Sequence, residues 1–136
     1  GQDVGQPVYL PIDSKFPAEA YERLLAASEA ANPDLVNAAS LELEQSIRTE
    51  AKRIAGKYIT PPYTTDFAIM FLPTEGLYAE ALRCRGLMEE LQQKHRILVS
   101  GPSTLSALLS SLQLGFRTLA IQKRSSEVWK VVLVVP

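Results

Sequence analysis

Apolar residues recur at intervals of three or four along much of the chain, a spacing that predicts amphipathic helices. The clearest helix begins at Asn32-Pro33-Asp34, which combines a capping residue, a proline and a first-turn acid, and it stops before Thr60-Pro61-Pro62. The residues of its predicted buried face are Val36, Ala39, Leu43, Ile47, Ala51, Ile54 and Tyr58. Three further helical segments are expected, over residues 17–31, 74–91 and 101–119. Gly86 can interrupt the middle one.

Short apolar segments between these helices predict buried strands. Residues 67–72 form an uninterrupted apolar run, typical of a strand buried on both faces, and residues 97–99 form a second one. Residues 8–15 read as a further strand, in which Pro11 indicates an edge or a bulge. Residues 128–135 are rich in β-branched side chains but follow a long helix, so a strand and a continuing helix both remain open. Strands that alternate with helices predict an α/β fold with parallel neighbours.

Composition sets outer limits on the function. The chain has 136 residues, of which 46% are hydrophobic and 21% charged, so it can bury a core as one domain. Its single cysteine, Cys84, excludes a disulfide framework and a Cys-rich zinc site. No apolar run reaches the roughly 18 residues of a membrane span, so we expect a cytoplasmic domain without membrane contact. The loop-like start at Gly1 and the apolar end at Pro136 read as a fragment of a longer protein.

Charge is unevenly distributed, although the net charge is only −1. Residues 1–35 carry six acidic and two basic side chains, whereas residues 115–136 carry four basic and one acidic. A polyanionic partner is therefore expected to meet the second stretch. Its basic residues are Arg117, Lys123, Arg124 and Lys130, with Trp129 beside the last. On a continuing helix they would form two rows suited to phosphate contacts, although a solvated helix face has the same composition.

Asp13 and Lys15 are the strongest local candidates for chemistry. Alternate residues of a strand share a face, so their side chains are expected to lie side by side at the end of the first strand. The carboxylate can bind a divalent cation, and the ammonium can orient a water molecule or stabilise charge on a phosphate. The alternative is an ordinary surface ion pair worth about 0–1 kcal/mol.

Two further acids are candidates for the same site. Glu75 starts a helix directly after a buried strand, at the sheet edge where ligands collect in α/β folds, and it is the better placed. Glu19 and Glu22 follow one helical turn after Lys15. Each of these acids can equally be a favourable charge in a first helical turn.

The remaining reactive side chains carry little signal. Cys84 lies between Arg83 and Arg85, whose charges are expected to lower the pKa of its thiol, but no partner set for a cysteine nucleophile is recognisable. His95 lies in a polar stretch without a second histidine to share a metal, and reads as a surface residue.

Four longer blocks of the sequence resemble the RmuC family of bacterial DNA recombination proteins. They stand in the family's order and cover the chain from about residue 8 to about residue 131, which excludes a chance match. The blocks are Ile12-Asp13-Ser14-Lys15-Phe16-Pro17 with Tyr21-Glu22-Arg23-Leu24, Asp66-Phe67-Ala68-Ile69-Met70-Phe71-Leu72-Pro73-Thr74-Glu75 with Leu77-Tyr78, Gly101-Pro102-Ser103-Thr104-Leu105, and Gly115-Phe116-Arg117-Thr118-Leu119-Ala120-Ile121-Gln122-Lys123-Arg124-Ser125.

The resemblance implies a restriction-endonuclease-like fold of the PD-(D/E)xK superfamily, an α/β fold whose mixed sheet is flanked by helices. Asp13 and Lys15 match the last acid and the lysine of that signature. The first acid of the signature lies on the preceding strand, and no segment before Asp13 reads as such a strand. We therefore expect residues 1–136 to be a single truncated nuclease-like domain that lacks its first strand. The family's coiled coil and membrane anchor are likewise expected to lie outside it.

The resemblance also implies a function: the family is thought to limit recombination between short inverted repeats, and nuclease activity is inferred for it. The first hypothesis is a Mg²⁺-dependent DNA nuclease, in which Asp13 and Glu75 bind the metal and Lys15 assists catalysis. The expected DNA-binding residues are Arg117, Lys123, Arg124 and Lys130. The fragment alone is expected to be inactive, because one strand carboxylate binds Mg²⁺ weakly.

The alternative hypothesis is a catalytically inactive module of nuclease fold that binds DNA or a recombination partner.

The edge of the predicted sheet also bears on assembly. If the first strand of the sheet is missing, the edge beside residues 8–15 is unpaired, and a homodimer through that edge is expected.

Overall fold

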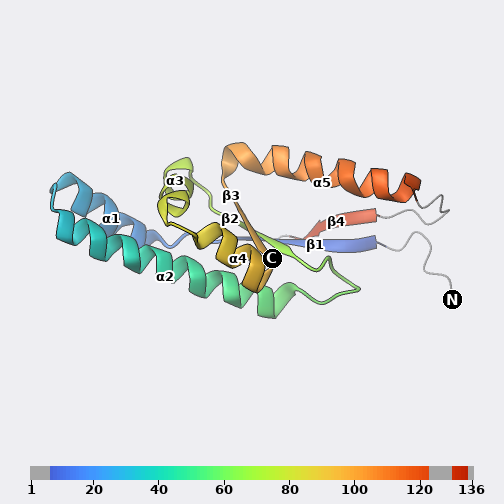
Figure 1. Ribbon diagram of the computed structural model, residues 1–136, viewed down its shortest axis with the longest axis horizontal. Coiled ribbons are helices and arrows are strands. Elements are labelled where there is room, and N and C mark those ends of the chain that lie inside the picture. The colour runs from blue at the N-terminus through green and yellow to red at the C-terminus, as the bar shows by residue number, and fades with distance from the viewer. Residues whose placement is uncertain (1–6, 123–129, 135–136) are drawn as a thin grey trace.

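The computed structural model describes residues 7–122 and 130–134. In chain order the elements are β1 (Pro7–Ser14), α1 (Ala18–Glu29), α2 (Pro33–Tyr58), β2 (Ala68–Phe71), α3 (Glu75–Arg83), α4 (Leu87–His95), β3 (Ile97–Ser100), α5 (Pro102–Gln122) and β4 (Lys130–Val134) (Figure 1). Strands and helices alternate as the hydrophobic pattern predicts, and the α/β class is confirmed. No helix within the described ranges is long and apolar enough to cross a membrane.

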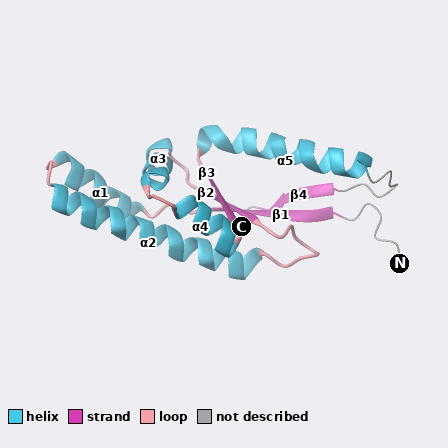
Figure 2. Ribbon diagram, in the orientation of Figure 1, coloured by secondary structure: helices cyan, strands magenta, loops and turns pink. Residues whose placement is uncertain are grey.

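The strands form one sheet in the order β3-β2-β1-β4, and the described pairings are all parallel (Figure 2). Parallel neighbours need long crossover connections, which the helices supply. A mixed sheet and the nuclease-like arrangement remain predictions, because no antiparallel pair occurs among these described strands. The open question at the carboxyl end is decided for Lys130–Val134, which form a strand.

β1 is an inner strand of this sheet. β4 pairs with Pro7–Pro11, and β2 pairs with Ile12–Ser14 on the other side. Opposite β4, the Tyr9 N–H donates to the Tyr63 carbonyl, and the Tyr9 carbonyl accepts from the Thr65 N–H at 2.9 Å. The edge expected to be unpaired beside residues 8–15 is therefore occupied along its first half. A homodimer stays a prediction, with less free edge to support it than expected.

The two faces of the sheet carry cores of different size. Along β2, Ala68 and Met70 belong to a large cluster that includes buried residues of α1, α2, α3 and α4. Ile69 points the other way, as strand alternation requires, and packs with Leu10 and Ile12. That second cluster is closed by half-buried leucines of α5, which lies across the opposite face from α2 (Figure 1).

α2 is the helix that fixes the site described below. It begins as predicted, since the Asn32 side chain accepts hydrogen bonds from the backbone N–H groups of Asp34 and Leu35. Its buried residues are Ala39, Leu43, Ile47, Ala51 and Ile54, all from the predicted face. Leu43 and Ile47 are each only 1% exposed. Because these buried residues fix α2 in the core, the positions next to them on the helix are also held in place.

Gly86 divides the predicted third helix into α3 and α4. It adopts a φ of 75°, in the left-handed region that favours glycine, and it stands directly before α4. The expected interruption is thus confirmed. It lets Leu77 and Ala81 of α3, and Leu87 and Leu91 of α4, enter the same core cluster.

Candidate functional site at the carboxyl end of β1

Asp13 is a buried acid at the end of β1, with only 6% of the residue exposed. Its partner across the β1–β2 ladder is Met70, which belongs to the cluster packed against α2. Paired residues of adjacent strands share a face, so Asp13 faces α2 whereas Ile12 faces α5. A carboxylate buried to this degree needs a compensating charge.

Lys15 supplies that charge. Its Nζ lies 3.3 Å from Asp13 Oδ2. The Lys15 backbone N–H donates to the Phe71 carbonyl at 3.0 Å, which continues the β1–β2 ladder past the end of the strand. The Lys15 side chain is 31% exposed and that of Asp13 9%. The predicted side-by-side placement is confirmed, and Lys15 is the more exposed side chain of the pair.

Glu50 of α2 joins this pair and was missed by the sequence reasoning. Its Oε2 lies 3.8 Å from Lys15 Nζ, and its Oε1 lies 3.4 Å from a guanidinium nitrogen of Arg53. The signal that would have found it is its position three residues after Ile47 and four before Ile54, in register with the buried face. An acid at such a position lies beside the core rather than in solvent.

Glu75 is engaged elsewhere at the same edge of the sheet. It begins α3 after β2, as expected, and its Oε1 accepts hydrogen bonds from the hydroxyl and the backbone N–H of Ser103, both at 2.5 Å. These bonds hold the pKa of Glu75 below its ordinary value. Because Ser103 lies in the first turn of α5, Glu75 satisfies a backbone donor at the start of that helix. Its role as a metal ligand stays a prediction.

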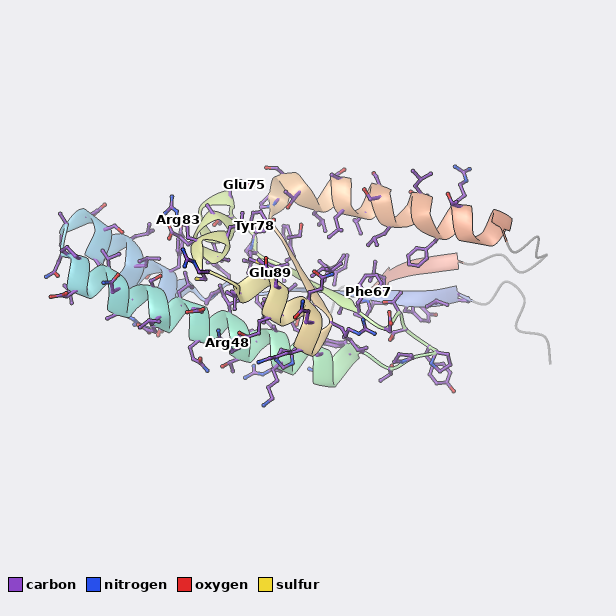
Figure 3. The ribbon with its side chains drawn as sticks, viewed as in Figure 1. Arg48, Phe67, Glu75, Tyr78, Arg83 and Glu89 are labelled. Atoms are coloured by element: carbon purple, nitrogen blue, oxygen red, sulfur yellow. The ribbon has the colours of Figure 1, made fainter. Side chains whose placement is uncertain are left out.

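Tight packing holds α3 against the start of α5. Figure 3 labels Glu75 and Tyr78 where the two helices adjoin. A Cβ added at Gly101, just before α5, would lie 2.8 Å from the Tyr78 ring, so only glycine fits there without movement. This close approach and the Glu75–Ser103 bonds together fix the edge of the sheet that adjoins Lys15.

The fit of the site to magnesium can be judged from its donors. Mg²⁺ takes oxygen ligands in octahedral geometry and dehydrates reluctantly. The Asp13 carboxylate is already in contact with an ammonium, and Glu75 is bonded to Ser103. Within the described ranges, no group of three or more His, Cys, Asp or Glu side chains is placed to hold a metal ion. These residues do not fit a magnesium site by themselves.

The predicted basic residues fall into different parts of the structure. Arg117 is exposed on α5. Lys123, Arg124 and Trp129 lie outside the described residues. Lys130 begins β4, so the helical alternative does not hold there and Lys130 forms no helical row with Lys123; its contact with DNA stays a prediction. The β-branched residues after Lys130 favour the extended chain.

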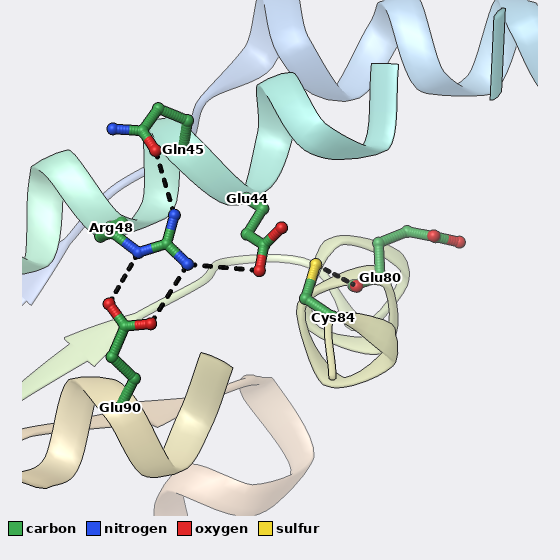
Figure 4. Close-up of polar contacts among 6 residues, drawn as sticks. All are labelled: Glu44, Gln45, Arg48, Glu80, Cys84 and Glu90. Carbon is green, nitrogen blue, oxygen red and sulfur yellow. Dashed lines mark hydrogen bonds and ion pairs between the residues drawn. The ribbon is translucent and has the colours of Figure 1, made fainter. Parts of the chain in front are cut away.

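The thiol of Cys84 is not activated as a nucleophile, because its pKa is raised above the ordinary value. Burial raises its pKa, and the nearby charges of Glu44 and Glu80 raise it further, against a smaller lowering by Arg48. Its Sγ donates to the Glu80 carbonyl at 3.5 Å (Figure 4). The lowering expected from the flanking arginines is therefore wrong, because the side chains that surround the thiol come from other turns.

Arg48 forms the most complete charge network in the described part of the chain. Its guanidinium donates to both carboxylate oxygens of Glu90, at 2.7 and 3.3 Å. It also donates to Glu44 at 3.3 Å and to Gln45 at 3.0 Å (Figure 4). Arg48 thus links α2 to α4. Its bond to Glu90 lowers the pKa of that carboxyl below its ordinary value.

Comparison with known proteins gives one consistent result. The DNA recombination protein RmuC homolog of Xylella fastidiosa (strain Temecula1 / ATCC 700964) is 60% identical over 125 residues, which are 92% of this chain and 27% of that protein. The DNA recombination protein RmuC homolog of Chlamydia muridarum (strain MoPn / Nigg) is 30% identical over 120 residues, 88% of this chain and 26% of that protein. The chain therefore spans about a quarter of the length of these curated relatives.

A third relative, the DNA recombination protein RmuC homolog of Neisseria meningitidis serogroup B (strain ATCC BAA-335 / MC58), is 38% identical over 105 residues, 74% of this chain and 17% of that protein. No solved structure matches the chain with significance. The family model described as RmuC family matches residues 3–135. On these grounds the chain belongs to the RmuC family.

Proposed function

We propose that this chain is the nuclease-like part of a DNA recombination protein and that its Asp13–Lys15 corner meets the phosphate backbone of DNA. The observation that carries the proposal is the pairing of a buried acid with a lysine whose side chain is partly exposed, at the carboxyl end of an inner parallel strand. In α/β sheets this is the edge where ligands collect. The names of the relatives support DNA recombination as the process.

The proposal gives each of these residues a part, which for Asp13 and Lys15 follows from their contact with each other. Asp13 holds the Lys15 ammonium at the strand end, and the ammonium stabilises negative charge on a phosphate oxygen. Arg117 on α5, together with Lys123, Arg124 and Lys130, contacts the backbone without reading sequence. Because bacterial DNA lies in the cytoplasm, the proposal also has this chain act there. Its proposed task there is to limit rearrangement at short inverted repeats.

Cleavage is proposed for a longer protein and not for this chain by itself. The described residues do not form a magnesium site, so at least one further carboxylate has to come from outside them. We expect this chain alone to leave supercoiled plasmid intact. A longer protein, matched in length to the curated relatives, is expected to nick the same plasmid when Mg²⁺ is present.

The decisive substitution is Asp13→Asn in that longer protein. It keeps the shape of the side chain and removes its charge, and nicking is expected to fall by about 100-fold or more. Glu42→Gln is the matched control, because Glu42 is an exposed acid of α2 that pairs with Arg23. Full nicking activity in Asp13→Asn, with the control also active, would rule out the nuclease proposal.

A module that binds DNA without cutting it is the second candidate. The observation that favours it is the ammonium already seated against Asp13, in a described region without a set of three metal ligands. Under this candidate, Lys15→Ala leaves DNA binding intact. Replacing Arg117 and Arg124 by Ala weakens binding to every sequence and reduces the slope of log affinity against log salt by about 2. Binding and its salt slope, measured by fluorescence anisotropy beside the nicking assay, separate the two candidates.

A further inference from the structure

Glu50 occupies an unfavourable position for a carboxylate. It lies in register with the buried face of α2, its side chain is 22% exposed, and its Oε2 atom is buried without a hydrogen-bond partner among the described residues. A buried oxygen that makes no hydrogen bond lowers the stability of the fold. An apolar side chain between Ile47 and Ile54 would avoid that loss, so the packing of the buried face does not account for an acid at this position.

The charges around Glu50 are arranged asymmetrically. Arg53, whose side chain is 62% exposed, lies 3.4 Å from the outer oxygen, Oε1. The inner oxygen, Oε2, faces the Lys15 ammonium at 3.8 Å, within ion-pair range but beyond hydrogen-bond length. The same ammonium lies 3.3 Å from Asp13 Oδ2. Lys15 is therefore within ion-pair range of two carboxylates that come from different elements, β1 and α2.

This placement matters for a lysine because its four-carbon stem is flexible and its ammonium acts as a point charge. One carboxylate alone would leave the ammonium free to move around Asp13. A second carboxylate, supplied by another element, limits that movement and helps to hold the ammonium at the carboxyl end of β1. Glu50 is itself held in place, because Ile47, Ala51 and Ile54 anchor its helix in the core.

We propose that Glu50 is a positioning residue for Lys15, a second carboxylate that holds the ammonium at the carboxyl end of β1. Its value for DNA rests on the proposed function above, in which this ammonium meets a phosphate. The placement of Lys15 itself can be tested without DNA. Glu50 thus extends the predicted two-residue motif to a third residue, supplied by α2.

The first experiment measures how readily the Lys15 amine reacts in this chain alone. The chain is treated with limiting acetic anhydride at neutral pH, and acetylation of each lysine is quantified by peptide mass spectrometry. An amine held between carboxylates reacts slowly, so Glu50→Gln is expected to raise the Lys15 rate by about two- to fivefold, the range for loss of one partly exposed ion pair. Lys52 and Lys57, on the same helix, serve as internal references.

Matched variants separate positioning from a general loosening of the fold. Glu42→Gln, the same substitution two turns earlier on α2, is expected to leave the Lys15 rate unchanged. Glu50→Asp keeps the carboxylate one methylene further back and should give a rate between those of the wild type and Glu50→Gln. It is also the test variant if Glu50→Gln fails to fold, as judged by circular dichroism. A Lys15 rate that is the same in the wild type and in the folded Glu50 variants overturns the positioning role.

A second experiment separates this proposal from the proposed function. In the longer protein, Glu50→Gln is expected to lower kcat for nicking by about tenfold with KM within twofold, because the ammonium is displaced while the backbone contacts proposed for the other basic residues remain. If Asp13→Asn leaves nicking intact but Glu50→Gln still accelerates acetylation, the nuclease proposal fails and the positioning of Lys15 stands. If acetylation is unaffected while Asp13→Asn abolishes nicking, the positioning role fails alone.

Discussion

Two charge clusters on α2 lie within one helical turn of each other and differ in how completely they are bonded. The Arg48 guanidinium makes four hydrogen bonds, to Glu90, Glu44 and Gln45, and it joins two helices (Figure 4). The Lys15 ammonium stands at 3.3 and 3.8 Å from two carboxylates, and one of the facing oxygens lacks a hydrogen-bond partner within the described part of the chain. We call the Arg48 cluster closed, because its charged groups are hydrogen-bonded to one another. We call the Lys15 cluster open, because a buried carboxylate oxygen beside the ammonium has no hydrogen-bond partner among the described residues.

This difference in hydrogen bonding assigns a structural role to the Arg48 cluster and a ligand-binding role to the Lys15 cluster. A guanidinium that already uses four of its five N–H donors has little remaining capacity for a ligand, and its removal leaves its partners without their donors. An ammonium held only by charge keeps donors free to bind a phosphate oxygen. The comparison also shows that sequence distance is a poor guide, because Arg48 and Glu50 are neighbours on one helix yet serve different clusters. Matched substitutions of Lys15 and Arg48 by Met, which keeps an unbranched stem, test this separation.

The largest expected effect is on catalysis. In the longer protein, Lys15→Met is expected to reduce plasmid nicking by about 100-fold at saturating DNA, because the charge that faces the phosphate is removed. Asp13 also loses its compensating charge, so the folded fraction is measured by urea denaturation under the assay conditions. If a folded Lys15→Met protein nicks plasmid at the wild-type rate, the Lys15 ammonium does not act on the DNA phosphate.

The second effect is on stability alone. Arg48→Met is expected to lower the free energy of unfolding by about 1 kcal/mol, the upper range for a partly exposed ion pair in water. Nicking per folded molecule is expected to stay within twofold of the wild type. Urea denaturation of this chain measures the first quantity, and the plasmid assay of the longer protein measures the second. A large loss of nicking with unchanged stability would reverse the assignment of the two clusters.

The sequence predicted those parts of the fold that depend on local pattern. The buried face of α2 and its Asn32 cap follow from residue spacing and capping chemistry. The shared face of Asp13 and Lys15 follows from strand alternation, and the structure confirms it at 3.3 Å. In each case the interacting residues lie within a few positions of one another, so that backbone geometry alone brings them together.

Contacts between distant segments were not predictable in the same way. Glu75 meets Ser103 because β2 and β3 are neighbours in the sheet, a pairing that no local spacing encodes. Glu50 reaches Lys15 because α2 crosses beside the end of β1. Cys84 misled the sequence reasoning for the same reason: its chain neighbours are arginines, but Glu44 lies close to the thiol in space. For Glu50 the sequence did contain a signal, because an acid in register with the buried face of a helix is expected to have a partner in the fold.

The smallest expected effect is on the pH dependence of stability, and it tests whether the Arg48 cluster is closed. The hydrogen bond from Arg48 depresses the pKa of Glu90 in the folded state. A depressed carboxyl pKa contributes stability that is complete above the unfolded value, about 4.3, and is lost as the pH falls through the folded value. Glu90→Gln should therefore flatten the fall in unfolding free energy below about pH 4. Glu89→Gln is the control, as a neighbouring acid on α4 for which the structure gives no ion pair among the described residues.

Equal acid sensitivity in the wild type and in Glu90→Gln would mean that the hydrogen bonds between Arg48 and Glu90 contribute nothing to stability at neutral pH. In that case, the number of hydrogen bonds would no longer distinguish the two clusters, and the open geometry around Lys15 would lose its significance.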